Sequence, residues 1–158
     1  MGIYRLLDVL KTTDRYKLFV LEIGDQDLDR IVTNLSSQTI KVTNIGKELS
    51  AYIDSLEDFR YLTIDVYDFL GKLLDERKSK LEEKANDVIV VFNLGILFEP
   101  VLELNAAQVL KDISKEASVI ILWEGIIDSQ DRLCWPTQKD KIFFDFNDVD
   151  IKKLSYAI

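Results

Sequence analysis

The sequence predicts a single α/β domain over residues 1–158, in which helices cover both faces of a mostly parallel sheet. Two observations lead to this three-layer prediction. Runs that are apolar almost throughout, at 16–23, 87–93 and 118–123, are typical of strands buried on both faces. Segments with helical periodicity separate these runs, as the crossovers between parallel strands require. The length of the chain fits one hydrophobic core.

The first two strands each lead into a helix with a polar cap. Asp25 or Asp27 places a carboxylate where it can accept hydrogen bonds from the free N–H groups at a helix start. Asn44 can do the same after a brief strand predicted over 39–42. A short amphipathic helix over 3–11 precedes these elements.

The longest helix is predicted over 63–82, and its charged end, 75–84, is typical of a solvated helix face. The side chains expected on its inner, apolar stripe are Ile64, Val66, Phe69, Leu70, Leu73 and Leu74. A further helix is predicted near 105–115. A last strand over 142–146 alternates apolar and polar residues, so we expect it at an edge of the sheet.

The composition excludes several classes of function. The chain has no histidine and one cysteine, Cys134, so it cannot build a His–Cys zinc site, a Ser–His or Cys–His catalytic pair or an internal disulfide. This cysteine usage and the lack of an apolar span or signal-peptide pattern lead us to expect a cytoplasmic protein that does not bind membranes. The net charge of -8 argues against binding nucleic acid on its own.

Ligands of parallel sheets lie at the carboxyl ends of the strands. The loop after the first strand has the position of a phosphate-binding loop but not its chemistry. Gly24 is followed by three aspartates within five residues, Asp25 among them, where a phosphate needs backbone N–H groups, a lysine and a hydroxyl. The strand over 87–93 ends in Asn93, although an acidic residue is needed there to hold magnesium.

We therefore predict no catalytic residue, no metal site and no required cofactor. Gly24, Asp25 and Asn93 mark a degenerate nucleotide site, at which weak binding through backbone groups remains an alternative.

Two tryptophans and one glutamate are the candidate partner-contacting residues. Core packing is the default for Trp123 and Trp135, but either side chain, if exposed, would anchor a protein partner. Glu124 directly follows the strand over 118–123 and could reach a site at the end of the sheet, although a simple turn explains it equally well.

Five segments carry a family resemblance, in the same order over most of the chain: 44–50, 90–100, 104–114, 119–125 and 132–133. Together they resemble BrxF, the small P-loop protein family of BREX-type phage-defence systems. The resemblance implies a P-loop-NTPase-like fold and an antiviral defence context. Members of that family look like small ATPases with a glycine-rich loop after the first strand and an acidic second motif.

This chain departs from the family at both ATPase motifs. Gly24 matches the start of the family loop, but residues 25–30 supply neither its later glycine nor its lysine and hydroxyl. Phe92 stands where the acidic residue is expected, and Gly95 where a later acidic residue tends to lie. The resemblance thus carries over the fold and the defence context, without ATP hydrolysis.

The leading hypothesis is a non-catalytic adaptor or regulatory subunit of a bacterial anti-phage complex, which binds a larger protein subunit of the defence system. One alternative is a divergent nucleotide-dependent ATPase subunit that a partner completes. Another is an accessory subunit that contacts DNA within a complex. A homo-oligomer is compatible with each of them.

Overall fold

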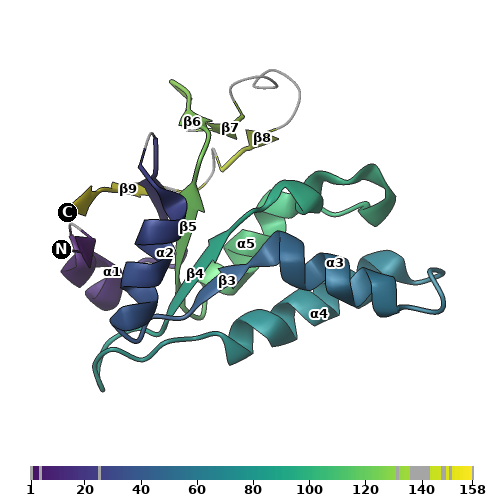
Figure 1. Ribbon diagram of the computed structural model, residues 1–158, viewed down its shortest axis with the longest axis horizontal. Helices are drawn as coiled ribbons and strands as arrows, with labels where there is room; N and C mark the ends of the chain where they lie inside the picture. The colour runs from purple at the N-terminus through teal and green to yellow at the C-terminus, as the bar shows by residue number, and fades with distance from the viewer. Residues whose placement is uncertain are drawn as a thin grey trace.

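A five-stranded parallel sheet forms the centre of the computed structural model, and helices lie on both of its faces (Figure 1). The structure describes residues 2–3, 5–24, 26–130, 132–135, 143–146, 149 and 151–157. The strand order is β3 (Val42–Asn44), β4 (Val88–Phe92), β5 (Ser118–Trp123), β2 (Leu18–Glu22) and β9 (Lys152–Leu154). Each neighbouring pair in this order is parallel. The α/β prediction, with a mostly parallel sheet between helices, is confirmed.

The helices form one layer on each face of the sheet. The first layer contains α1 (Leu6–Lys11) and α2 (Leu28–Ser37), and the second contains α3 (Ile45–Ser55), α4 (Leu62–Glu76) and α5 (Ala106–Ser114). Successive residues of a strand point to opposite faces, so each strand contributes to two separate cores.

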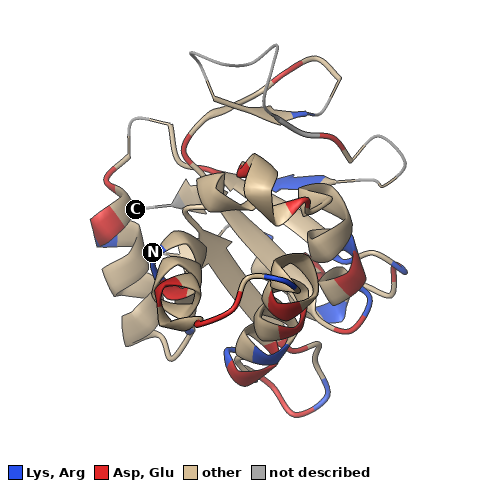
Figure 2. Ribbon diagram, turned by 90° about the vertical axis from the view of Figure 1, so that its right-hand side faces the viewer, with Lys and Arg blue, Asp and Glu red and all other residues tan. Residues whose placement is uncertain are grey.

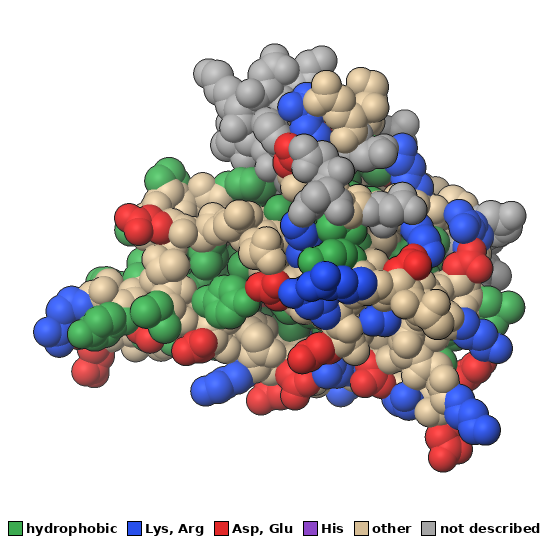
Figure 3. Space-filling model, turned by 180° about the vertical axis from the view of Figure 1, so that it is seen from behind, with side chains coloured by type: hydrophobic (Ala, Val, Ile, Leu, Met, Phe, Trp, Pro, Cys, Tyr) green, Lys and Arg blue, Asp and Glu red, His purple; other side chains and the backbone are tan. Residues whose placement is uncertain are grey.

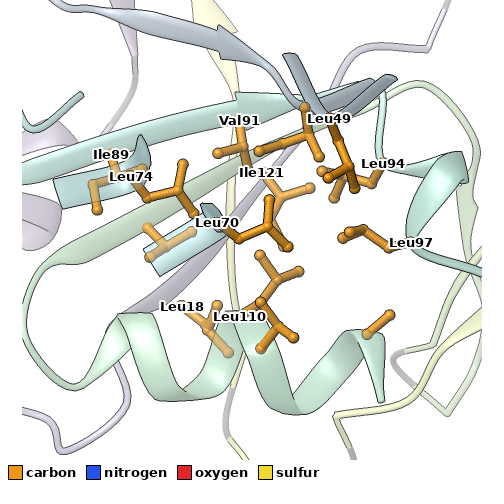
Figure 4. Close-up of a cluster of buried hydrophobic side chains, with 14 of the residues drawn as sticks. Leu18, Leu49, Leu70, Leu74, Ile89, Val91, Leu94, Leu97, Leu110 and Ile121 are labelled. Carbon is orange, nitrogen blue, oxygen red and sulfur yellow. The ribbon is translucent and has the colours of Figure 1, made fainter. Parts of the chain in front are cut away.

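In β5, Val119 and Ile121 pack with the layer of α3, α4 and α5, whereas Ile120 and Leu122 pack with that of α1 and α2. Figure 4 shows the larger of these two cores. It includes Leu70, Leu74, Ile89, Val91 and Leu110.

Polar caps begin three of the helices. Asp27 accepts hydrogen bonds from the backbone at the start of α2, Asn44 does so for α3, and Asn105 does so for α5. The caps predicted at Asp27 and Asn44 are confirmed. Asp25, the other candidate cap of α2, lies outside the described residues.

The end of α4 differs from the prediction, because the helix stops at Glu76 and the charged segment that follows is a loop. Ser79 explains the early stop. Its N–H donates to the Val88 carbonyl at 2.8 Å, and the Val88 N–H donates back at 2.9 Å. The Ser79 hydroxyl also accepts the Lys41 N–H at 2.8 Å. These bonds hold Ser79 extended beside β4, which a helical backbone does not allow.

The strand predicted over 39–42 lies later, at β3, because Thr39 ends α2 in a left-handed conformation. Its φ is 64°, and the Ile40 N–H donates back to the Leu35 carbonyl at 3.0 Å. This arrangement closes the helix in the manner of a Schellman turn. A strand can therefore begin only after Ile40.

The last strand of the main sheet was also predicted wrongly. Within 142–146, the described strand is β8 (Phe143–Phe144), which joins β7 (Leu133–Cys134) and β6 (Ile126–Ile127) in a separate antiparallel sheet. The edge position beside β2 belongs to β9. The two ends of the chain meet where β1 (Gly2–Ile3) pairs with β10 (Tyr156–Ala157).

Two 3₁₀ helices, η1 (Gly95–Phe98) and η2 (Pro100–Leu102), connect β4 to α5. In the part of the chain that the structure describes, no helix combines the length and apolar character needed to cross a membrane.

Candidate functional site

The carboxyl ends of three strands bring the predicted site residues to one edge of the sheet. Gly24 follows β2 and Asn93 follows β4, and β5 lies between these two strands. Neighbouring strands are about 4.8 Å apart, so the ends of β2 and β4 are separated by roughly 10 Å. Trp123 and Glu124 occupy the end of β5 between them.

The turn after β2 is closed by backbone hydrogen bonds of the protein itself. The Ile23 N–H donates to the Trp123 carbonyl at 2.9 Å and extends the pairing of β2 with β5. Gly24 then turns the chain with a φ of 59°, and the Gln26 N–H donates to the Ile23 carbonyl at 3.0 Å. A phosphate-binding loop instead wraps around its anion with a longer, glycine-containing run.

The first N–H groups of α2 bind a carboxylate of this chain. Asp27 Oδ1 accepts the N–H of Asp29 at 3.0 Å and that of Arg30 at 3.4 Å. A phosphate bound at a helix start uses such N–H groups together with the positive end of the helix dipole. The Asp27 carboxylate therefore takes the place that a bound anion would occupy.

Asn93 belongs to a structural junction between β3, α3 and β4. Its Nδ2 donates to Asn44 Oδ1 at 2.8 Å, and the same oxygen accepts the Lys47 N–H at 3.0 Å. The Asn93 carbonyl accepts the Gly46 N–H at 2.9 Å. A Cβ added at Gly46 would lie 2.3 Å from Asn93 Nδ2, so the close approach requires glycine. The Asn93 side chain thus holds α3 against the end of β4.

Trp123 connects the main sheet to the small antiparallel sheet. Its side chain is 3% exposed, and its Nε1 donates to the carbonyls of Ile126 at 3.0 Å and Cys134 at 3.2 Å. A Cβ at Gly125 would lie 2.1 Å from the Cys134 carbonyl oxygen, so the two segments are in direct contact. Core packing is therefore the role of Trp123, and it is not an exposed anchor for a partner.

The other two predicted partner-contacting residues are more accessible. Trp135 is half-buried, with its ring centroid 4.8 Å from that of Trp123 and 5.4 Å from that of Phe98 in η1. Glu124, which follows Trp123 in the chain, is exposed. The three rings join β5, β7 and η1, so their first effect is to position the small sheet.

The turn between β6 and β7 is built around Asp128. Its Oδ1 accepts the N–H of Gln130 and that of Arg132, each at 2.9 Å, and its Oδ2 accepts Arg132 Nε at 2.6 Å. The backbone hydrogen bond from Arg132 lowers the pKa of Asp128 below its ordinary value. Cys134 is buried beside this turn, as expected of a structural thiol. The three hydrogen bonds to Asp128 give it a structural role in the turn. A carboxylate held ionised in this way is also a poor general acid.

An apolar groove lies away from the sheet edge, between the α3–α4 turn and η2. We call it the α3–α4 groove; it has a volume of about 540 Å³. Its lining includes Ile53, Phe59, Tyr61, Ile64, Val101 and Glu103. Thr63 also lines the groove, and its hydroxyl donates to the Leu102 carbonyl at 2.6 Å and fixes α4 to η2. Figure 3 shows hydrophobic side chains exposed over this end of the molecule, on the left of the view.

Sequence reasoning missed this groove because Ile64 was assigned to the buried stripe of α4. Ile64 is 62% exposed, whereas Leu62, Val66 and Leu70 are buried. Residues four apart share a helix face, but a residue two positions away points to roughly the opposite side. The spacing of Ile64 from Leu62 and Val66 was therefore the available indication that Ile64 faces outward.

A hydrogen-bonded acid lies on the outer surface between α4 and α5. Tyr67 donates from its hydroxyl to Asp112 Oδ2 at 2.7 Å, and Gln108 Nε2 donates to Oδ1 at 2.8 Å. Burial opposes ionisation of Asp112, but these hydrogen bonds outweigh it and leave the pKa of Asp112 below 3.8. Among the described residues, no group of three or more acidic or cysteine side chains is arranged to hold a metal ion.

Comparison with protein-family models, with curated proteins and with solved structures finds no match to this chain.

Proposed function

We propose that this protein is a non-catalytic, P-loop-like adaptor or regulatory subunit of a bacterial anti-phage defence complex, and that it acts by binding a larger protein partner. The resemblance of its ordered segments to BrxF supplies the biological context of the proposal. Because a fold alone does not determine function, the argument for a non-catalytic role rests on the chemistry of the site.

The order of the strands supports a P-loop-like layout. The first strand of the main sheet, β2, lies between β5 and β9, and β4 lies on the far side of β5. In the family that the chain resembles, the phosphate loop follows the first strand, which corresponds to β2 in this sheet. Under this proposal, the degenerate loop at Gly24, at the carboxyl end of β2, corresponds to the loop at which such an enzyme would bind its nucleotide.

The observation that carries the proposal is the carboxylate of Asp27 at the start of α2. Its hydrogen bonds to the N–H groups of Asp29 and Arg30 satisfy donors that would otherwise bind phosphate. Its negative charge also repels a triphosphate at that position. At the end of β4, neutral Asn93 is bound to Asn44, so it provides no charged ligand for magnesium.

The exposed side chains of the α3–α4 groove support the partner-binding half of the proposal. Single exposed apolar residues are ordinary, but several around one groove are typical of an interaction site. Phe59, Tyr61, Ile64 and Val101 are all exposed there.

Nucleotide binding is the direct test of the non-catalytic role. We expect isothermal titration of the purified protein with ATP and magnesium to detect no micromolar affinity, and we expect no hydrolysis above the protein-free background. Either activity would reject the proposal. Co-expression with the products of neighbouring genes tests the adaptor role, since the protein should elute with one of them as a complex of fixed stoichiometry.

The strand order also favours one alternative, an ATPase subunit completed by its partner. A partner can supply an arginine or a magnesium ligand in trans. The alternative predicts hydrolysis by the complex that exceeds the sum of the separate proteins, and the adaptor proposal predicts no such increase.

A further inference from the structure

The walls of the α3–α4 groove are apolar and accessible without any change in the fold. Ile64 is 62% exposed on α4, and Val101 is 70% exposed on η2. Phe59 and Tyr61 face solvent from the turn between α3 and α4. Thr63 lines the groove, and its hydrogen bond to the Leu102 carbonyl ties the α4 side of the groove to the η2 side.

The segments that form the groove carry most of the excess negative charge of the chain. Over 53–66 and 95–105 there are six acidic side chains and one basic one, a formal charge of -5 out of -8 for the whole protein. The six are Asp54, Glu57, Asp58, Asp65, Glu99 and Glu103. The single cation, Arg60, is paired with Asp58 at 2.7 Å. Figure 2, which views the molecule from this end, shows the acidic and basic positions along these elements.

Resting on the partner-binding function proposed above, we infer that the α3–α4 groove receives an amphipathic helix of the partner whose apolar stripe is flanked by lysine and arginine. Apolar residues at positions i, i+3, i+4 and i+7 of such a helix can lie on Ile64 and Val101. Its cations then meet the acidic side chains of these segments, including Glu103, which lines the groove. Arg60 also lines the groove, and its charge is paired with that of Asp58.

The same charges argue against two alternative occupants of the groove, a second copy of this chain and a nucleic acid. A second copy of this chain would bring the same excess of negative charge against the first, and like charges across an interface oppose association. A nucleic acid would place phosphates beside these carboxylates and would find few cations to displace its counterions. A basic amphipathic helix is the occupant for which both the apolar walls and the negative charge of these segments contribute favourably.

A pair of synthetic peptides tests this inference with the full chain. The probe is an 18-residue peptide with leucines at i, i+3, i+4 and i+7 and lysines elsewhere, and its control is a scrambled peptide of the same composition. We expect fluorescence anisotropy to show micromolar binding of the probe at 50 mM salt. The scrambled peptide should bind at least about tenfold more weakly, because its leucines share no face.

Substitutions in the protein locate the binding surface. Ile64→Asn combined with Val101→Asn should weaken probe binding at least about tenfold, because both anchoring contacts lose apolar area. Leu7→Asn is the matched control, since Leu7 is also 62% exposed but lies on α1, and it should change the affinity less than about twofold. Glu103→Lys should weaken binding about threefold and reduce its salt dependence.

The inference is overturned if the groove and control variants bind the probe equally, or if the scrambled peptide binds as well as the probe. It is also overturned if the protein forms a dimer that Ile64→Asn dissociates, as measured by light scattering after size exclusion. These results concern only the groove. The adaptor proposal has its own tests, nucleotide binding and co-elution with a partner, so failure of one leaves the other to be judged separately.

Discussion

One substitution made at two glycines, Gly46→Ala and Gly71→Ala, should change stability in opposite directions. Both glycines lie in helices, where alanine is favoured over glycine by about 1 kcal/mol in the interior. A Cβ at Gly71 finds no atom within 4 Å, so this variant should gain about 0.5–1 kcal/mol.

At Gly46 the same methyl group meets the junction with Asn93. It would lie 2.3 Å from Asn93 Nδ2 and 3.1 Å from the Asn93 carbonyl oxygen. The Asn93 side chain must rotate away and lose its 2.8 Å hydrogen bond to Asn44. A lost hydrogen bond of about 1 kcal/mol and overpacking of about 1–2 kcal/mol exceed the helix gain, which is small in the first turn. Gly46→Ala should therefore lose about 1–2 kcal/mol.

Urea denaturation at pH 7 measures both free energies, and thermal melts provide a second readout. For a chain of this size, a difference of about 2 kcal/mol between the variants corresponds to roughly 4–8 °C in Tm. Asn93→Gly removes the obstructing side chain and suits the φ of 59°, so Gly46→Ala should cost at least about 1 kcal/mol less in that background. The reasoning fails if both alanine variants shift stability in the same direction, or if Asn93→Gly leaves the cost unchanged.

Further substitutions test the Asp27 cap, the hydrogen bond to Asp112 and the turn at Thr39. Asp27→Ala should lower the free energy of unfolding by about 1 kcal/mol, because α2 loses its cap. Asp27→Asn keeps the acceptor oxygen and should lower it by less than half as much. Urea denaturation measures both values, and equal losses would show that the cap is not the cause. Tyr67→Phe should cost about 0.5–1 kcal/mol at pH 7. Because the folded pKa of Asp112 is lowered, the stability that its hydrogen bond with Tyr67 contributes is present above pH 3.8 and is lost as the pH falls through the folded pKa. The Tm profiles of the unsubstituted protein and of Tyr67→Phe should therefore converge in acid. A constant difference between the two profiles would contradict the assignment. Thr39→Gly should stabilise the protein by about 0.5–1 kcal/mol, because Thr39 has a φ of 64°, which is unfavourable for a β-branched residue. Thermal melts measure the change, and a loss of stability would contradict the prediction.

The sequence predicted the central strands well because burial on both faces leaves an unambiguous apolar run. The strand over 118–123 has the predicted bounds, and β4 differs from the prediction by one residue at each end. The strand β9 was missed because its three residues include Lys152 and Lys153, which carry no apolar pattern. Its place in the sheet comes from pairing with β2, a contact that local sequence does not encode.

The candidate site was predicted by position but not by contact. Gly24, Asp25 and Asn93 were identified as marking a degenerate nucleotide site. Gly24 and Asn93 lie at the carboxyl edge, and Asp25 lies outside the described residues. Periodicity could not show that Asn93 binds Asn44, since the two residues are 49 positions apart in the chain. The apolar groove was missed for a different reason, because exposure of Ile64 depends on which helix faces meet.

The pairing of β2 with β9 has a consequence for synthesis of the protein. Phe19 lies opposite Lys152, so β2 must wait for this neighbour until the intervening residues 23–151 have been synthesised. Until then, one side of an apolar strand has unpaired N–H and C=O groups, which favour association with other strands. A nascent chain released before residue 152 should therefore aggregate, whereas one extended through β9 should remain dispersed after release from the ribosome.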